Sequence, residues 1–347
     1  MTLSPSPWWH PNAHADRRPI LLARNRIVSN ARAFFEERGF IDVDCGPLQV
    51  SPGNEAHLHA LSTELLRPGE APRRMYLHTS PEFACKKLLA AGEPAIFSLA
   101  KVYRNRERSP LHSPEFTMLE WYRANQTYDV IMRDVIDLMR SSVLAIGARE
   151  LRYKDLWADP FAVPDYLTVA AAFRLHGGID LMASLRADGS ADRDALAKMA
   201  EASGLKFGID ESWSDIFSRV IAERVEKELG RSKPTVLYEY PSVEAALARK
   251  CAHDPRVAER FEVYACGVEL ANGFGELTDA VEQRLRFTKE MDRKERIYGE
   301  RYPLDEELLS ALAIMPEASG VALGLDRLVM LATGATRIDQ VIWTPVA

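Results

Sequence analysis

The sequence predicts an α+β fold in which an antiparallel sheet is covered by helices. Apolar and polar residues alternate at 40–45, at 116–123 and again within 231–277, as expected of half-buried strands. Between these stretches, apolar residues recur with helical spacing in separate blocks. No G-x-G-x-x-G follows an early strand and no G-x-x-x-x-G-K-[ST] occurs, which disfavours a dinucleotide-binding fold. Any bound nucleotide would therefore be held without a P-loop.

The chain should begin with an arm, a helix and a strand. Residues 1–19 contain several prolines, so we expect a flexible N-terminal arm. From about residue 20 to residue 38 apolar side chains follow helical spacing, and Gly39 suits the end of that helix. Residues 40–45 then alternate as a strand.

The later elements are assigned by the same reasoning. A helix should begin near Glu82, because Ser80 can cap it and Pro81 suits its first turn. The rest of the expected order is a loop and hairpin at 51–75, a mostly helical segment at 126–230, strands at 231–277, helices at 278–299 and 304–315, and a last helix at 325–332. We assign 20–347 to one domain, with 131–230 as its mainly helical segment.

Composition places few limits on function. The chain has 347 residues, of which 47% are hydrophobic and 27% charged, and these are ordinary values for a globular protein. Its net charge of −6 argues weakly against a surface built to grip nucleic acid. The four cysteines form no C-x-x-C pair, so we expect reduced core residues of a cytoplasmic protein. No apolar run approaches the roughly 20 residues of a membrane span, and the N-terminus lacks the apolar core of a secretory signal.

The stretch from Val102 to Arg123 carries the first chemical signal. An arginine, a polar loop and a histidine precede a strand that places Glu120 and Tyr122 on one face. A guanidinium suits a nucleotide's phosphate, and a carboxylate beside a phenol suits an amino acid's ammonium.

The stretch from Arg260 to Ala280 carries the second signal. If the turn between two strands is Ala265-Cys266, Glu262 lies directly across from Glu269. Facing carboxylates repel each other, and magnesium would remove that cost because it favours carboxylates plus substrate phosphates. The alternative, that one glutamate faces solvent, remains open at this point.

Two glycine-containing runs complete the pattern. In Asn272-Gly273-Phe274-Gly275-Glu276, the glycines allow a ligand to approach the backbone closely, and the polar residues offer it a carboxamide and an anion. In SGVALGLDR, which spans 319–327, small strand residues would pack against a flat ligand, and an arginine at the start of a helix can reach it.

These segments resemble a known family. The helix and strand at 20–45 resemble motif 1 of class II aminoacyl-tRNA synthetases, VYRNRERSPLHSPEFTMLEWYR resembles motif 2 of the lysyl branch, and SGVALGLDR resembles motif 3. EFTMLEWYR, ERFEVY, ELANGF and SGVALGLDR also resemble the elongation factor P–(R)-β-lysine ligase family. The roughly twenty residues before motif 1 are too few for an anticodon-binding domain, which favours that free-standing family.

The resemblance implies a role for each matching residue. Arg104 would bind the α-phosphate and the substrate carboxylate, and Arg327 would sandwich the adenine with Phe116. Glu82 and Glu120 would receive the α-ammonium, Tyr122 and Glu276 the side-chain ammonium, and Asn272 the carboxylate.

Arg104 and Arg327 are thus the expected catalytic residues, and Glu262 and Glu269 the expected magnesium ligands. The expected substrate-binding set is Ser80, Glu82, Glu120, Tyr122, Asn272, Glu276 and Ala322. The expected ATP-binding set is Arg104, Asn105, Arg106, Glu107, His112, Ser113, Phe116, Glu269, Leu270, Gly324 and Arg327.

One position departs from the family pattern. Motif 2 normally reads Arg-x-Glu, whereas Arg106 stands here at the glutamate position and Glu107 follows it. Either Glu107 substitutes through a shifted loop, or a backbone group reads the base. A second detail is Ala322, where lysyl-tRNA synthetases generally have glycine. A single methyl group can alter discrimination by roughly 1–3 kcal/mol, so we expect Ala322 to favour β-lysine over α-lysine.

The resemblance therefore predicts ATP- and magnesium-dependent activation of lysine or (R)-β-lysine and its transfer to a lysine of elongation factor P, by a homodimer. Two alternatives remain. One is a truncated lysyl-tRNA synthetase acting on tRNA or another acceptor, although tRNA is not the expected partner. The other is a catalytically silent regulatory paralogue, which Arg106 favours and the many clustered charges oppose.

Overall fold

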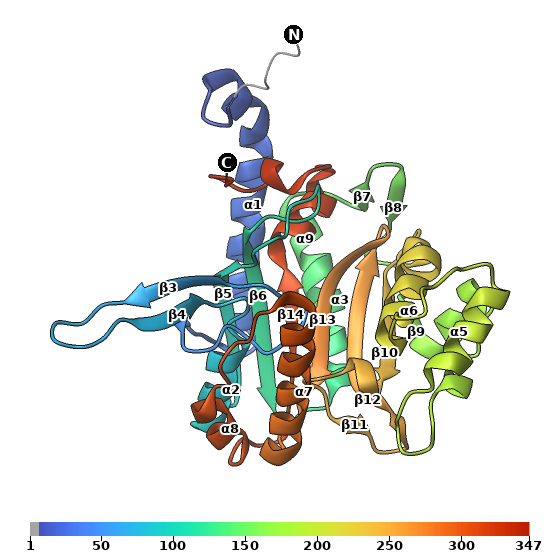
Figure 1. Ribbon diagram of the computed structural model, residues 1–347. Coiled ribbons are helices and arrows are strands. Elements are labelled where there is room, and N and C mark those ends of the chain that lie inside the picture. Colours follow the sequence, from blue (N-terminus) through green and yellow to red (C-terminus); the bar gives the residue numbers. More distant parts are fainter. Residues whose placement is uncertain (1–6, 347) are drawn as a thin grey trace, which may run out of the picture.

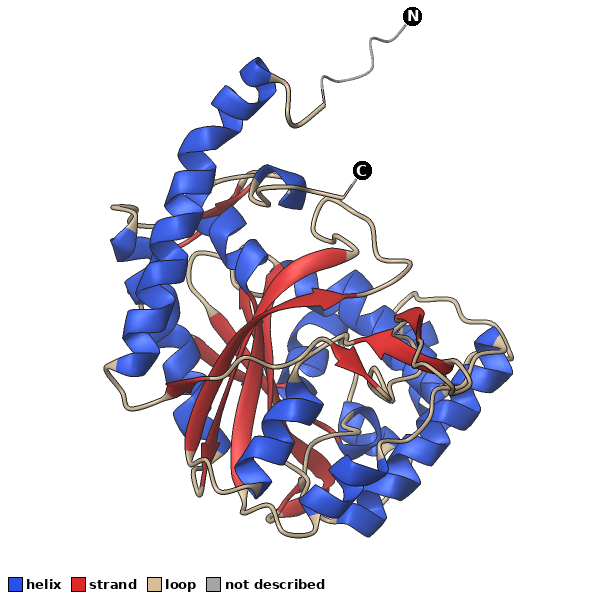
Figure 2. Ribbon diagram, turned by 90° about the vertical axis from the view of Figure 1, so that its left-hand side faces the viewer, coloured by secondary structure: helices blue, strands red, loops and turns tan. Residues whose placement is uncertain are grey.

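A computed structural model describes residues 7–346 and has a nine-stranded sheet at its centre (Figure 1). The strand order is β1-β5-β6-β14-β13-β12-β10-β9, and β11 pairs with β12 alone. Only the two edge pairings, β1 with β5 and β10 with β9, are parallel. Helices lie on both sides of the sheet in the view of Figure 2. The predicted α+β class with an antiparallel sheet is confirmed.

The elements have the following bounds. The helices are α1 (Pro11–Glu36), α2 (Glu82–Ala90), α3 (Tyr128–Ala145), α4 (Val169–Ala172), α5 (Arg193–Ala202), α6 (Trp213–Val220), α7 (Ala280–Tyr298), α8 (Glu306–Leu312) and α9 (Leu325–Thr333). The strands of the large sheet are β1 (Ile41–Asp42), β5 (Ala95–Tyr103), β6 (Glu115–Ala124), β9 (Asp165–Thr168), β10 (Thr235–Pro241), β11 (Lys250–Cys251), β12 (Asp254–Ala265), β13 (Val268–Gly275) and β14 (Ala318–Gly324). The smaller sheets contain β2 (Leu48–Gln49), β3 (Leu61–Leu65), β4 (Arg73–Leu77), β7 (Leu151–Tyr153) and β8 (Leu156–Ala158).

Helix α1 corrects the expectation of a flexible arm. It begins at Pro11, well before the predicted start, and its N-terminal half rises beyond the body of the molecule (Figure 1). Proline is tolerated at a first helical position because its missing N–H would have no intrahelical partner there. Gly39, with φ of 77°, follows the helix as predicted. Residues 1–6 of the expected arm lie outside the described residues.

The segment at 131–230 is less helical than predicted. Strands β7, β8 and β9 interrupt it, and β9 extends the main sheet beside β10. Its remaining helices enclose a separate cluster of buried side chains, including Phe173, Trp213 and Phe217, that packs against Tyr240 of β10. The part of the segment that follows β8 is therefore a helical extension at one edge of the sheet, whereas α3 packs in the main core.

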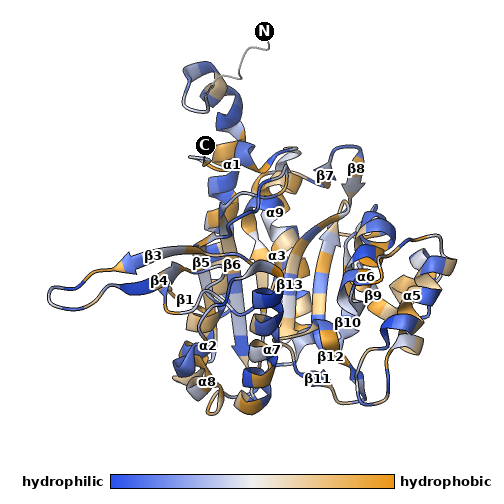
Figure 3. Cartoon of the chain, viewed as in Figure 1, coloured by the Kyte–Doolittle hydropathy of each residue, from blue (hydrophilic) through white to orange (hydrophobic). Residues whose placement is uncertain are grey.

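Alternation along the central strands separates the core from the opposite face. Leu119 and Trp121 of β6 and Leu323 of β14 belong to the main core, which includes residues of α1, α3 and α9. Glu120 and Ala322 of the same strands face the other way and line a cavity. Helix α7, with a highly charged sequence, is coloured largely hydrophilic in Figure 3. In the described part of the chain, no helix combines the length and apolar character needed to cross a bilayer.

Candidate active site

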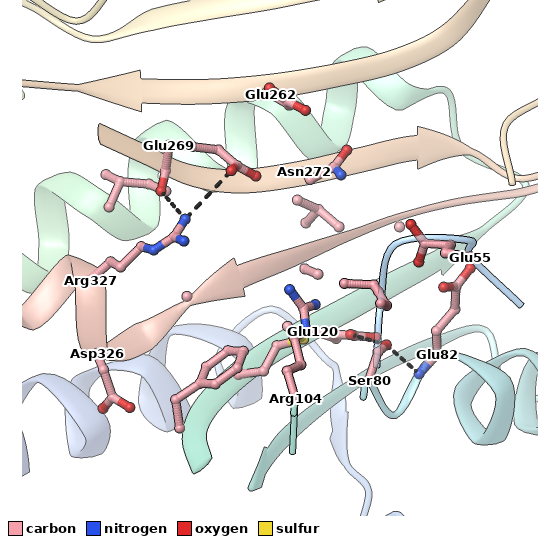
Figure 4. Close-up of a pocket in the computed structure, with 18 of the residues that line it drawn as sticks. Glu55, Ser80, Glu82, Arg104, Glu120, Glu262, Glu269, Asn272, Asp326 and Arg327 are labelled. Atoms are coloured by element: carbon pink, nitrogen blue, oxygen red, sulfur yellow. Dashed lines mark hydrogen bonds and ion pairs between the residues drawn. The ribbon is translucent and has the colours of Figure 1, made fainter. Parts of the chain in front are cut away.

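The cavity on the face of the sheet opposite the main core has a volume of about 310 Å³ (Figure 4). Its walls come from β6, β12, β13 and β14, from the start of α2 and from the loop that follows β5. All but two of the predicted site residues line it. The residues it brings together are Ser80, Glu82, Arg104, Glu107, His112, Ser113, Phe116, Glu120, Tyr122, Glu262, Glu269, Leu270, Asn272, Glu276, Ala322, Gly324 and Arg327. Three segments that are distant in sequence thus form one site.

One end of the cavity is strongly acidic. Glu120 is fully buried, and its two carboxylate oxygens accept hydrogen bonds from Ser80 Oγ at 2.5 Å and from Tyr122 Oη at 2.7 Å. Ser80 Oγ also accepts from the backbone N–H of Glu82 at 3.0 Å, but the N-cap of α2 is Pro81, so the predicted cap lies one residue too early. Burial, followed by the nearby Glu82, raises the pKa of Glu120 to about 8. This end would therefore be stabilised by a bound cation.

A buried lysine joins two carboxylates of the acidic end. Lys86 Nζ lies 2.6 Å from Glu82 Oε1 and 2.7 Å from Glu276 Oε2. The side chains of Lys86 and Glu276 are each 1% exposed. Burial raises the pKa of Glu276 to about 7, although Lys86 opposes that rise. Sequence reasoning missed Lys86, although its spacing of four residues from Glu82 on a helix was a visible signal.

Two acceptor atoms at this end remain open to a ligand. Within residues 7–346, Asn272 Oδ1 and Glu276 Oε1 are buried and accept no hydrogen bond. Buried polar atoms without partners are rare, and a ligand that donates hydrogen bonds would satisfy them. Gly320 makes room for it, since a Cβ there would lie 2.8 Å from Glu276 Oε1 and 2.1 Å from Tyr122 Cδ1.

The other end of the cavity carries the arginines. The guanidinium carbon of Arg104 lies 5.3 Å from the ring centroid of Phe116, and its Nε donates to Thr79 O at 3.3 Å. Arg327 Nη1 donates to Glu269 O at 2.9 Å, and its Nη2 donates to His112 Nε2 at 2.8 Å. Burial and Arg327 lower the pKa of His112, as expected of a neutral ring that accepts from a guanidinium. Cationic and aromatic groups thus converge where a nucleotide would need them.

The hairpin of β12 and β13 corrects the predicted register. Its turn is Cys266-Gly267, with φ of 54° and 69°, as in a two-residue turn with both central residues left-handed. Glu262 pairs with Asn272, and Glu269 pairs with Tyr264 instead of Glu262. A register shift between Val263 and Tyr264 gives β13 one more residue than β12 at this point. This bulge lets both glutamates line the cavity without facing each other.

The two glutamates fit a hard divalent cation. Glu262 Oε2 accepts from Tyr240 and Tyr264, each at 2.5 Å, and Oε1 accepts from Arg260 at 2.7 Å. Burial and then the charge of Glu262 raise the pKa of Glu269, with Arg327 acting in the opposite direction. A third carboxylate, Glu226, has its pKa raised to about 7 by burial and by these same two glutamates. Magnesium would relieve this repulsion, since it takes oxygen ligands from carboxylates.

Comparison with known proteins agrees with this geometry. A family model described as class II tRNA synthetases (D, K and N) matches residues 12–347. A protein of Avibacterium paragallinarum named elongation factor P–(R)-β-lysine ligase is 39% identical over 336 residues, which cover 96% of each chain. A protein of the same name from Proteus mirabilis is 40% identical over 347 residues, or 97% of each chain. The chain belongs to this ligase family. It is accordingly an ATP-dependent ligase built on a class II synthetase domain.

The departure from the family's motif 2 has a structural counterpart. Arg106 does not line the cavity; its Nη2 donates to Glu300 Oε1 at 2.8 Å, beyond the end of α7. Its φ of 66° turns the loop so that Glu107 lies on the cavity wall. Asn105 also lies off the wall, where its side chain accepts from the backbone N–H of Arg106. These two members of the predicted ATP-binding set therefore do not line the cavity, whereas Glu107 does.

Several residues of this ligase-family site were not predicted from sequence. Glu55 lines the cavity near Glu82, and burial raises its pKa. The position of its loop depends on a residue that is distant in the sequence, so no local pattern indicated it. The buried Lys294 of α7 holds this loop by donating to Ala56 O at 3.0 Å and to Leu58 O at 2.6 Å. Arg260 was detectable, since it lies two residues from Glu262 and therefore on the same face of β12.

Proposed function

We propose that the chain activates (R)-β-lysine or lysine with ATP and transfers the resulting acyl group to a lysine side chain of elongation factor P. One observation carries the proposal: a single cavity places open acidic acceptors at one end and arginines at the other. The acidic end suits two ammonium groups, and the arginines suit a carboxylate and phosphates. The names of the relatives supply the acceptor and the β-amino acid.

The chemistry needs no nucleophile from the protein. In the first step an oxygen of the substrate carboxylate attacks the α-phosphorus of ATP, a new P–O bond forms, and pyrophosphate leaves. Arg104 would stabilise the charge that develops on the α-phosphate. In the second step the acceptor's amine attacks the acyl carbon, an amide bond forms, and AMP leaves. The loss of one proton from the amine completes the balance.

Magnesium would be held by Glu269 and Glu262, and when bound it would neutralise charge on the phosphates of ATP. The side chains at the arginine end hold and orient the nucleotide. His112, neutral beside Arg327, can donate or accept a hydrogen bond through small changes of the loop that precedes β6. The predicted homodimer and the cytoplasmic location remain predictions.

The proposal is tested by ATP–pyrophosphate exchange with lysine and with (R)-β-lysine, followed by transfer assays that offer elongation factor P and bulk tRNA side by side. We expect exchange that depends on magnesium and acylated elongation factor P with uncharged tRNA. Charged tRNA with unmodified protein would instead support the truncated synthetase. An absence of exchange with both amino acids would support the silent paralogue.

The choice between α- and β-lysine is proposed to depend on Ala322. In β14 this residue pairs with Asn272 on one side and Glu120 on the other, so its methyl group lies between the proposed carboxylate and ammonium contacts. Ala322→Gly is expected to shift the preference in adenylate formation toward α-lysine by roughly one order of magnitude. An unchanged ratio of the two exchange rates would contradict this role.

A further inference from the structure

Within residues 7–346, Lys86 is the buried cation that pairs with carboxylates of the acidic end, and the proposed mechanism gives it no task. It projects from α2, and its side chain is 1% exposed. Burial alone would lower the pKa of Lys86, but Glu276 and Glu82 more than offset this, and its pKa is raised above the ordinary value. The lysine therefore stays charged, and its removal would leave two buried carboxylates without a counter-charge.

The contacts of Glu276 are divided between the protein and the cavity. Its Oε2 atom is held by Lys86 at 2.7 Å. Its Oε1 atom accepts no hydrogen bond from the described residues and lies beside Gly320, where the cavity has room for a ligand. Lys86 thus holds Glu276 from behind and leaves one oxygen available to a substrate.

The same cation also separates two like charges. Glu82 raises the pKa of Glu276, whereas Lys86 lowers it. The other charged and titratable groups that act on or are affected by Glu276 are Arg249 before β11 and Tyr122 on β6. Of these groups, only Lys86 makes a direct ion pair with Glu276 in residues 7–346. Without it, burial and repulsion would favour a protonated, neutral Glu276.

We propose that Lys86 is a positioning residue that keeps Glu276 ionised and oriented, and that it thereby sets the preference of the site for a diamino acid over a monoamino acid. The inference rests on the proposed function, in which Glu276 receives the side-chain ammonium of the substrate. If Glu276 were a neutral carboxylic acid, the site would bind an aliphatic chain end about as tightly as an ammonium group. An anion rejects the aliphatic end because its own desolvation is then uncompensated.

The test compares lysine with norleucine, which has the carbon chain of lysine without the side-chain ammonium. The measured quantity is the ratio of kcat/KM for the two amino acids in ATP–pyrophosphate exchange, which does not depend on the fraction of active enzyme. For Lys86→Met at neutral pH we expect this ratio to fall at least about tenfold, the factor that corresponds to one pKa unit. It should recover as the pH is raised, because Glu276 then ionises without the lysine.

Lys87→Met is the matched control. Lys87 is the next residue of α2, but it pairs with Asp305 at 2.8 Å and Glu307 at 3.4 Å, at the start of α8 and away from the cavity. This variant loses a lysine from the same helix and should keep the ratio of the wild type. If Lys86→Met fails to fold, Lys86→Gln replaces it, because an amide can still donate hydrogen bonds to both carboxylates while lacking the charge.

The outcomes separate this inference from the proposed function. If the wild type shows no exchange with lysine or (R)-β-lysine, the proposed function fails. If the wild type prefers lysine and the neutral variants lose both substrates in equal proportion at every pH, Lys86 is only structural and the inference is overturned. Lys86→Arg keeps the charge, so it must keep the wild-type ratio of kcat/KM for lysine and norleucine. A lower ratio in Lys86→Arg would overturn the inference as well.

Discussion

Asp326 and Arg24 form a buried ion pair, with 2.8 Å between Asp326 Oδ1 and Arg24 Nη2. The other oxygen of Asp326 accepts from the backbone N–H of Thr117 at 2.7 Å. One carboxylate in the first turn of α9 therefore connects α1 to β6. Because Asp326 directly precedes Arg327, this connection also fixes the start of the helix that presents Arg327 to the cavity.

Asp326→Ala should destabilise the fold strongly, because it leaves the buried Arg24 guanidinium without its anionic partner and the buried N–H of Thr117 without its acceptor. We expect a loss of about 3–5 kcal/mol in the free energy of unfolding, measured by urea denaturation. Asp292→Ala is the control: its partner is Arg301 on the surface, and the loss should be within about 1 kcal/mol. Equal losses for the two variants would contradict a structural role for the buried pair.

The KM for lysine should depend on pH through Glu276. Burial places the pKa of this carboxyl at about 7, so protonation removes the ammonium acceptor below that value. Raising the pH from about 6 to about 8 should lower the KM by roughly tenfold. Glu120, with a pKa of about 8, acts in the same direction. Glu276→Gln should have a high KM that lacks most of this dependence, and a KM that rises with pH in the wild type would contradict the assignment.

Two neighbouring arginines should differ sharply in their importance. Arg104 lines the cavity, and Arg104→Lys should lower the exchange rate by roughly 10²–10³, because an ammonium cannot replace the guanidinium fork. Arg106 is paired with Glu300 outside the cavity, so Arg106→Lys should leave the rate within about threefold of the wild type. A large loss at Arg106 would mean that its loop moves into the cavity when ATP binds.

Gly320→Ala should remove lysine binding by filling the acidic end. The added methyl group would lie 2.1 Å from Tyr122 Cδ1, so the tyrosine must move from its contact with Glu120. We expect the KM for lysine to rise by at least about tenfold and stability to fall by roughly 1–3 kcal/mol. Gly46→Ala is the control, since a Cβ there meets no atom within 4 Å in the described structure. A variant with an unchanged KM would argue that the substrate lies elsewhere.

Local patterns predicted the parts of the site that lie on single elements. Alternation in 116–123 correctly placed Glu120 and Tyr122 on one face of β6, and the start of α2 was predicted to within about one residue. The turn between β12 and β13 could not be placed in this way, because Cys266 adopts a left-handed conformation that a sequence pattern gives no reason to assign to it.

Contacts between distant segments explain the remaining errors and omissions. Lys86 and Glu276 meet only when α2 packs beside the end of β13, and the loop of Glu55 is fixed by a lysine of α7. The early start of α1 was hidden by prolines that usually mark irregular segments, although Pro11 is compatible with a helix start. Each case depends on tertiary packing, which local periodicity does not report.

The bulge in the β12–β13 hairpin determines which side chains of β13 face the cavity, so it affects catalysis as well as folding. Asn272 and Glu269 are three residues apart and would lie on opposite sides of a regular strand, yet the extra residue brings both into the cavity. Regular pairing with the same number of residues would return Glu269 to the helix-packed side, whereas deleting one of the two residues between them would remove the bulge and keep both side chains on the cavity side. The site therefore relies on an odd spacing along β13 that only an irregular strand accommodates, so a hairpin one residue shorter would preserve a geometry that a regular hairpin of the present length would lose.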